Sequence, residues 1–111
     1  MMLFKRGVSI KGLRPEALLG MILCDQIFKD EGWTFTVTSC TDSIHSEGSL
    51  HYKGLAFDVR TKTLSDPPDT HLTLKAALAP LGFDVVLEKD HLHLEWDEKK
   101  DAAIRRMIKG S

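Results

Sequence analysis

Residues 48–60 read Gly-Ser-Leu-His-Tyr-Lys-Gly-Leu-Ala-Phe-Asp-Val-Arg. After Gly54 the side chains alternate, and one face of a strand would carry Leu55, Phe57 and Val59 while the other carries Ala56, Asp58 and Arg60. The segment before it, residues 40–50, is small, polar and glycine-containing, which is typical of a loop. The stretch therefore predicts a half-buried strand that exposes the Asp58 carboxylate, with His51 at the end of the loop seven positions earlier.

A second stretch, residues 90–96, reads Asp-His-Leu-His-Leu-Glu-Trp. Its alternation predicts a strand with His91, His93 and Glu95 on one face and Leu92, Leu94 and Trp96 on the other. Residues 83–87 predict the preceding strand, and residues 88–90 form the turn of a hairpin between the two. Because the apolar face must pack on helices, the histidine face is expected to point into a groove.

The rest of the chain predicts one more strand and three helices. Pro15 suits the first turn of a helix that Gly32 ends. The stripe expected to pack that helix on the core is Leu18, Leu19, Ile22, Leu23 and Ile27. Residues 33–39 alternate large apolar and hydroxyl side chains and predict a strand.

A short apolar helix is expected to follow Asp66 or Asp69 and to be closed by Pro80 and Gly82. A final amphipathic helix would begin at Asp97 and place Ile104, Met107 and Ile108 inward. Residues 1–14 are expected to form an arm or a short edge element. The predicted fold is α+β, a single domain over residues 1–111, in which flanking helices pack on an antiparallel sheet of about four strands.

Composition restricts the partners of this domain. The 111 residues include 15 basic and 16 acidic side chains, for a net charge of −1, which gives no electrostatic reason to expect binding to nucleic acid or an anionic membrane. No apolar run approaches the length of a membrane span, and residues 1–6 lack the features of a signal peptide. Cys24 and Cys40 are expected to be small buried residues, and a bridge between them stays open.

Three of these side chains form a candidate metal site. If the strands that carry Asp58 and His93 are neighbours, their side chains converge, and His51 can complete the set. Imidazole nitrogen and carboxylate oxygen are the donors of catalytic zinc sites, in which three protein ligands leave one position for water. We therefore expect Zn²⁺ as the cofactor, bound on the open face of the sheet.

A zinc hydrolase also needs a general base near that water. His91 and Asp90 both lie close in sequence to His93, and either could serve. Strict alternation favours His91, whereas Asp90 lies at the turn, where alternation does not hold. Glu95 is either an outer partner that orients a histidine or an exposed strand residue. Two isolated histidines, His45 and His71, are expected at the surface, with His45 at the rim of the site.

Residues 49–60 resemble the Ser-x-His-x-x-Gly-x-Ala-x-Asp motif of the M15 metallopeptidase family, and residues 90–95 resemble its second motif. The family includes D-alanyl-D-alanine carboxypeptidases and the L-alanoyl-D-glutamate endopeptidases of phage endolysins, and the resemblance spans about residues 33–97. It implies His51, Asp58 and His93 as zinc ligands and Asp90 as base. In related His-x-His sites, of the hedgehog and murein endopeptidase type, the position of His91 assists catalysis.

One departure concerns substrate binding. Many relatives carry an arginine shortly after the first strand, whereas residues 38–42 here read Thr-Ser-Cys-Thr-Asp. Lys53 or Arg60 could take its place, and Ser49 of the first motif is a further candidate contact.

The resulting hypothesis is a monomeric zinc metallopeptidase that hydrolyses an amide bond in peptidoglycan stem peptides, as a phage endolysin or a carboxypeptidase does. It would stay in the host cytoplasm until released to the cell wall, or reside in the phage particle. An alternative is a non-catalytic zinc-binding phage or host-interaction protein that keeps the fold. A third is an iron oxygenase with two histidines and one carboxylate, which the spacing and the helix-rich antiparallel pattern disfavour.

Overall fold

A computed structural model describes residues 2–41 and 53–97. These residues form a small α+β domain with five strands and two α-helices. The elements in chain order are β1 (Met2–Phe4), α1 (Pro15–Glu31), β2 (Phe35–Ser39), β3 (Ala56–Arg60), α2 (Pro67–Leu78), the 3₁₀ helix η1 (Ala79–Leu81), β4 (Phe83–Leu87) and β5 (His91–Trp96).

The five strands form one mixed sheet in the order β1-β2-β3-β5-β4. Neighbours from β2 to β4 are antiparallel, as expected, but β1 pairs with β2 in parallel. The prediction of an antiparallel sheet of about four strands is therefore wrong at this edge. With only three residues, β1 is too short for alternation to reveal it.

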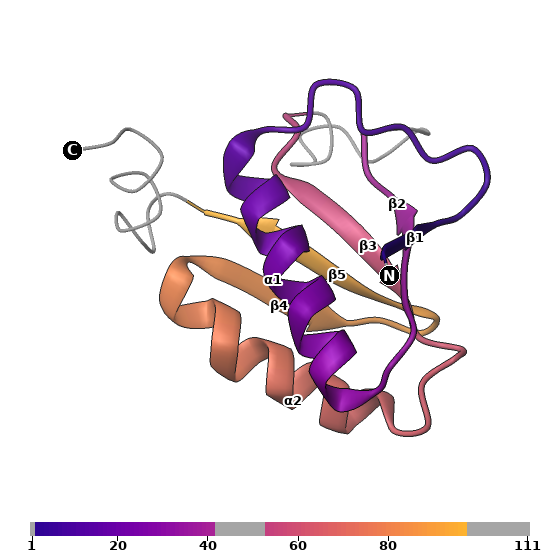
Figure 1. Ribbon diagram of the computed structural model, residues 1–111. Coiled ribbons are helices and arrows are strands. Elements are labelled where there is room, and N and C mark those ends of the chain that lie inside the picture. The colour runs from indigo at the N-terminus through magenta and orange to yellow at the C-terminus, as the bar shows by residue number, and fades with distance from the viewer. Residues whose placement is uncertain (1, 42–52, 98–111) are drawn as a thin grey trace.

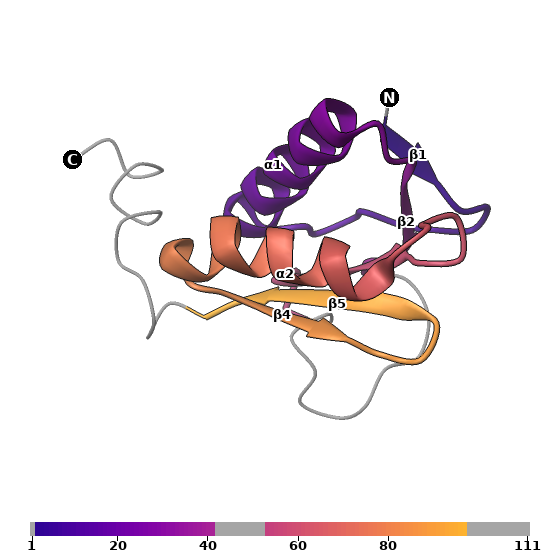
Figure 2. The same cartoon turned by 90° about the horizontal axis from the view of Figure 1, so that it is seen from below.

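Both helices pack on the same face of the sheet, as Figures 1 and 2 show. The inner face of the sheet contributes fully buried Phe57, Val59, Leu92 and Leu94 to the core. Apolar side chains alternate along β3 and β5, so burying them turns the intervening polar side chains to the opposite face. The four strands that alternation predicted are confirmed, and the expected histidine face lies opposite the face on which α1 and α2 pack.

Helix α1 has the expected ends but a different inward face. It begins at Pro15, and Gly32 ends it with a left-handed φ of 76°. The side chains that it buries are Glu16, Ala17, Met21, Cys24 and Phe28. Three residues of the predicted stripe, Leu19, Leu23 and Ile27, are partly buried and pack against the core. The other two assignments are wrong, because Leu18 is 44% exposed and Ile22 is 50% exposed.

The reason is the close approach of α1 to the sheet. A Cβ atom added at Gly20 would overlap the ring of Phe83, so the helix touches β4 through a glycine. Ala17 and Cys24, which have small side chains, are fully buried on the same helix. A stripe chosen for bulky side chains misses a buried face in which small residues lie beside Met21 and Phe28.

Helix α2 begins after Asp66, whose carboxylate accepts a hydrogen bond of 3.2 Å from the backbone N–H of Asp69. Of the two residues predicted to start this helix, Asp66 is therefore confirmed. The helix ends at Leu78, and η1 continues to Gly82, which has a φ of 93°. No helix within the described part of the chain is both long and apolar enough to cross a membrane. The helix expected from Asp97 onward falls in residues 98–111, outside the described residues.

The two cysteines are buried in the core and are not joined by a disulfide. The Cys40 thiol lies 3.8 Å from the carbonyl oxygen of Ala56, to which it can donate a weak hydrogen bond. Burial raises the pKa of the Cys24 thiol. Both residues therefore act as small apolar packing groups, as the sequence predicted.

Candidate functional site

The register between β3 and β5 brings Asp58 and His93 together. They are direct cross-strand partners, and Nδ1 of His93 lies 2.9 Å from Oδ1 of Asp58. The two side chains sit on the outer face of the sheet and are largely buried, at 14% and 17% exposure. The expectation that these two candidate metal ligands converge is confirmed.

Glu95 contacts the second nitrogen of the same imidazole ring. Its Oε1 atom lies 2.9 Å from Nε2 of His93. Both ring nitrogens of His93 thus face carboxylate oxygens, and the doubly protonated ring can donate to both. The hydrogen bond to Asp58, with a further contribution from Glu95, raises the pKa of His93, and burial opposes this shift only in part.

The neighbouring ring, that of His91, lies between three carboxylates. Its Nδ1 atom lies 2.7 Å from Oδ1 of Asp90, and its Nε2 atom lies 3.5 Å from Glu88 and 3.9 Å from Asp58. The hydrogen bond from His91 lowers the pKa of the fully exposed Asp90 carboxyl. Asp90 and His91 therefore form one hydrogen-bonded pair beside Asp58, and the ionised form of Asp90 is the favoured one.

The glycine of the first motif has a clear structural reason. Gly54 has a φ of 71°, a left-handed conformation that side chains disfavour. Its carbonyl accepts a 2.9 Å hydrogen bond from the N–H of Arg14, and an added Cβ atom would overlap the carbonyl oxygen of Gly12. Gly54 thereby fixes the start of β3 against residues 12–14, which positions Asp58 four residues later.

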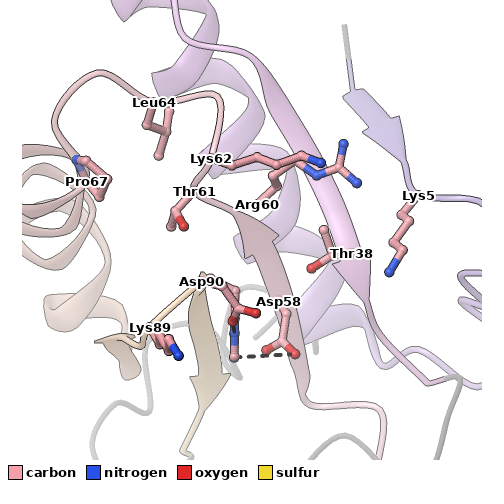
Figure 3. A pocket seen from close by; sticks show the side chains of 11 residues that line it. Lys5, Thr38, Asp58, Arg60, Thr61, Lys62, Leu64, Pro67, Lys89 and Asp90 are labelled. Carbon is pink, nitrogen blue, oxygen red and sulfur yellow. Dashed lines mark hydrogen bonds and ion pairs between the residues drawn. The ribbon is translucent and has the colours of Figure 1, made fainter.

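A pocket of about 580 Å³ opens beside these groups (Figure 3). Asp58, Asp90 and His91 line it together with side chains from β2, the segments after β1 and β3, and the turn between β4 and β5. This volume is within the range of small-ligand sites. The acid–base pair and one candidate metal ligand therefore share a cavity that is open to solvent.

The candidate substrate contacts separate into two groups. Arg60 lines the pocket, whereas Lys53 is exposed and is not among the lining residues. The third candidate contact, Ser49, lies outside the described residues, as do the proposed zinc ligand His51 and the expected rim residue His45. Of the two proposed replacements for the missing arginine, the geometry favours Arg60.

His71 is not the exposed residue that its sequence context suggested. Its side chain is half-buried, and Nε2 lies 2.8 Å from the carbonyl oxygen of Val85. The contact joins α2 to β4 on the side of the sheet that the helices cover. His71 is therefore structural and has no place in the candidate site.

The donor atoms of Asp58 and His93 fit a zinc site. Two ligands of one tetrahedral zinc ion, each at about 2.1 Å, lie about 3.4 Å apart. The observed separation of 2.9 Å needs only a small adjustment to reach this value. Zinc-binding histidines generally direct their second ring nitrogen to a carboxylate, and Nε2 of His93 is directed to the carboxylate of Glu95 in this way.

Residues 2–41 and 53–97 contain no complete group of three His, Cys, Asp or Glu side chains suited to a metal ion. The described part of the chain therefore provides two of the three expected ligands. The third, His51, belongs to the stretch that is not described.

Sequence reasoning missed three of the four basic side chains that line the pocket, Lys5, Lys62 and Lys89; the fourth, Arg60, was already a candidate contact. Lys5 lies more than fifty residues before Asp58 in the sequence and follows a strand that alternation could not detect. Sequence reasoning also missed Glu88, which lies beside His91. Only the lysine at the predicted hairpin turn, Lys89, could have been placed near the site from its position.

Comparison with known proteins adds no relative. No protein-family model matches the chain, and no curated protein matches it.

Proposed function

We propose that this protein is a zinc-dependent peptidase that hydrolyses an amide bond in peptidoglycan stem peptides. The observation that supports it most is the pairing of Asp58 with His93 beside the Asp90–His91 pair, at one open pocket. Two separate sequence motifs supply these groups, and both resemble motifs of the M15 metallopeptidases. The fold requires neither pair, because they lie on the face of the sheet away from the core.

Asp58, His93 and His51 are the proposed zinc ligands. When bound, zinc would polarise the scissile carbonyl group and lower the pKa of a water molecule. Glu95 fixes the ring of His93 through Nε2, which leaves Nδ1 directed at Asp58 and the proposed metal position. The fixed ring is the main contribution of β5 to the site.

Asp90 and His91 are the proposed acid–base pair. Asp90 lines the pocket as a carboxylate, which can accept a proton from water and then return it to the leaving amine. Its lowered pKa keeps it ionised but also makes it a weaker base. His91 shares a hydrogen bond with Asp90 and lies 3.9 Å from Asp58, so it links the base to the ligand side of the pocket. We propose Asp90 as the base and His91 as its partner.

The substrate would be a peptidoglycan peptide, cut by a monomeric protein without nucleic acid or membrane insertion. An endolysin-like endopeptidase and a carboxypeptidase remain the two forms of this activity. The proposal also includes action at the cell wall after release from the host cytoplasm, or from a phage particle. These parts rest on the motif resemblance and on the charge balance of the sequence.

The test combines elemental analysis with release of new amines from purified peptidoglycan. Wild type should contain one zinc ion per chain and release amines. His93→Ala should lose both zinc and activity, because one of its ligands is removed. Asp90→Asn should keep zinc and lose turnover by about 100-fold or more, the usual contribution of a general base.

His71→Gln provides the matched control, because it alters a histidine on the helix-covered face and should retain zinc and activity. Zinc without amine release would favour the non-catalytic zinc-binding protein instead. Absence of bound zinc from the wild type would refute the metal site. Ferrous-dependent oxygen uptake would point to the oxygenase.

A further inference from the structure

Helix α1 exposes a pair of apolar side chains on the side away from the core. Leu18 is 44% exposed and Ile22 is 50% exposed, and four positions separate them, so they lie one turn apart on the same side of the helix. Single exposed apolar side chains are common on protein surfaces, but two at this spacing form a ridge on which a second helix can pack.

An acidic group borders this pair. Asp25 follows Ile22 by three positions, which places it on the same side of α1. One oxygen of its half-buried carboxylate is out of contact with solvent, and that oxygen has no hydrogen-bond partner within residues 2–41 and 53–97. Buried carboxylate oxygens normally accept a hydrogen bond, so a donor is missing at this position. We refer to Leu18, Ile22 and Asp25 as the exposed face of α1.

The chain leaves the sheet close to this exposed face. Phe83 and Trp96 are cross-strand partners at the end of β5, and the ring of Phe83 lies against Gly20. Gly20 is two residues from each member of the apolar pair, so β5 ends at their level along α1 (Figure 1). The backbone N–H of Asp97 donates a 2.9 Å hydrogen bond to the carbonyl of Gly82, which fixes the point from which residues 98–111 continue.

Residues 98–111 suit the exposed face of α1 in length, pattern and charge. Their apolar residues Ile104, Met107 and Ile108 have helical spacing. Residues 98–103 can span about 20 Å when extended, which is enough to pass around a helix about 10 Å across. Residues 98–111 carry five basic and two acidic side chains, whereas α1 carries four acidic side chains and one basic. The segment and the helix therefore have opposite net charges.

The same charges argue against a second copy of α1 as the occupant of this face. A symmetric contact between two α1 helices would bring together two surfaces that are both acidic. Like charges that face each other across an interface disfavour association. A basic segment tethered at Asp97 meets no such repulsion, and the tether gives it a high effective concentration.

We propose that residues 98–111 dock as an amphipathic helix on the exposed face of α1. The apolar stripe of the segment would cover Leu18 and Ile22, and one of its basic side chains would donate to the carboxylate of Asp25. The docked segment would lie on the helix side of the sheet, so the candidate site on the opposite face would stay open. This inference does not depend on the proposed peptidase function.

Paired cysteines in the full-length chain test the contact. Ile22→Cys combined with Met107→Cys should form an intramolecular disulfide under mild oxidation, identified by mass spectrometry of the digested protein. Val86→Cys combined with Met107→Cys is the matched control, because Val86 is 45% exposed but lies on the opposite face of the sheet, as the partner of His93. The control should form about tenfold less of the disulfide, since docking lowers its effective concentration. The native cysteines are buried and should not compete.

Unfolding of point variants provides a second measurement. Ile22→Asp and Ile108→Asp should each lower the midpoint of urea unfolding, because each places a charge in an apolar contact. The double variant should show no more than about the larger of the two single shifts, since both changes remove the same contact. Leu72→Asp, at a 65% exposed position of α2, is the control, and its shift should add to that of Ile108→Asp.

Three outcomes would overturn the proposal. A disulfide that forms at position 86 in preference to position 22 would mean that the segment lies over the candidate site instead. A disulfide that joins two chains would mean that the segment docks on a second copy. Equally low yields for both cysteine pairs, together with additive unfolding shifts for Ile22→Asp and Ile108→Asp, would mean that the segment does not dock on α1.

Discussion

At the scale of single residues, His93 is the most constrained polar side chain of the site. Carboxylates hold both of its ring nitrogens at 2.9 Å, one from β3 and one from its own strand. The sequence predicted the approach of Asp58 to His93 because strand alternation places each on the outer face. The sequence left the role of Glu95 open, because strand alternation places it on the outer face whether it is exposed to solvent or hydrogen-bonded to a histidine.

This arrangement predicts a pH dependence for protein prepared without metal. The pKa of His93 is raised above its ordinary value of 6.5, first by the hydrogen bond with Asp58. The resulting stabilisation should be complete below about pH 6.5 and should be lost as pH rises through the raised pKa. Proton titration of the ring by NMR, and urea unfolding at several pH values, measure the two effects.

Asp58→Asn should lower the pKa of His93 most, and Glu95→Gln should lower it less, in keeping with the order of their effects. Asp30→Asn, at the exposed end of α1, is the matched control and should leave the titration unchanged. A His93 ring in the wild type that titrates below 6.5 would contradict the described geometry.

At the scale of elements, strands were easier to predict from the sequence than the orientation of helices. Alternation identifies four strands because each packs one face on the core, but three residues of β1 carry no such pattern. In α1 apolar side chains occur on more than one side, so periodicity alone favoured Leu18 and Ile22 over the true inward face. That face depends on the contact of Gly20 with Phe83, which belongs to a distant segment.

The orientation of α1 can be tested with two adjacent residues. Met21 is 1% exposed and Ile22 is 50% exposed. Met21→Ala should lower the free energy of unfolding by about 2–4 kcal/mol, because it leaves a cavity in the core. Ile22→Ala should cost about 1 kcal/mol or less. Urea unfolding of both variants gives the comparison, and the reverse order would mean that α1 is rotated about its axis.

At the scale of the whole molecule, one core on one face of the sheet leaves the other face for the proposed site. Buried apolar residues of both helices and of β2, β3, β4 and β5 belong to that core, which also includes Cys24 and Cys40. The basic side of the pocket could not be predicted, because it joins segments that the sequence separates widely. Only the sheet order, with β1 beside β2 and β2 beside β3, brings Lys5 toward Asp58.

The reactivity of the two buried thiols tests whether the core is packed as described. Neither Cys24 nor Cys40 is in a disulfide, both side chains are buried, and burial raises the pKa of the Cys24 thiol. A thiol reagent should therefore react with neither cysteine in the native protein and with both in denaturant. Reducing agent should leave the melting temperature unchanged. Rapid reaction of the native protein, or loss of both thiols under non-reducing denaturation, would contradict the described core.

The parallel pairing of β1 has a consequence for how the pocket moves. Short edge strands open locally at a small free-energy cost, whereas central strands open only with the whole domain. Asp58 and His93 lie on β3 and β5, in the interior of the sheet, but Lys5 follows its outermost strand. The proposed zinc ligands Asp58 and His93 thus belong to the part of the sheet that opens last, whereas Lys5 belongs to the part that opens first. In the proposed enzyme, the wall of the pocket at Lys5 can therefore move while Asp58 and His93 keep their relative positions.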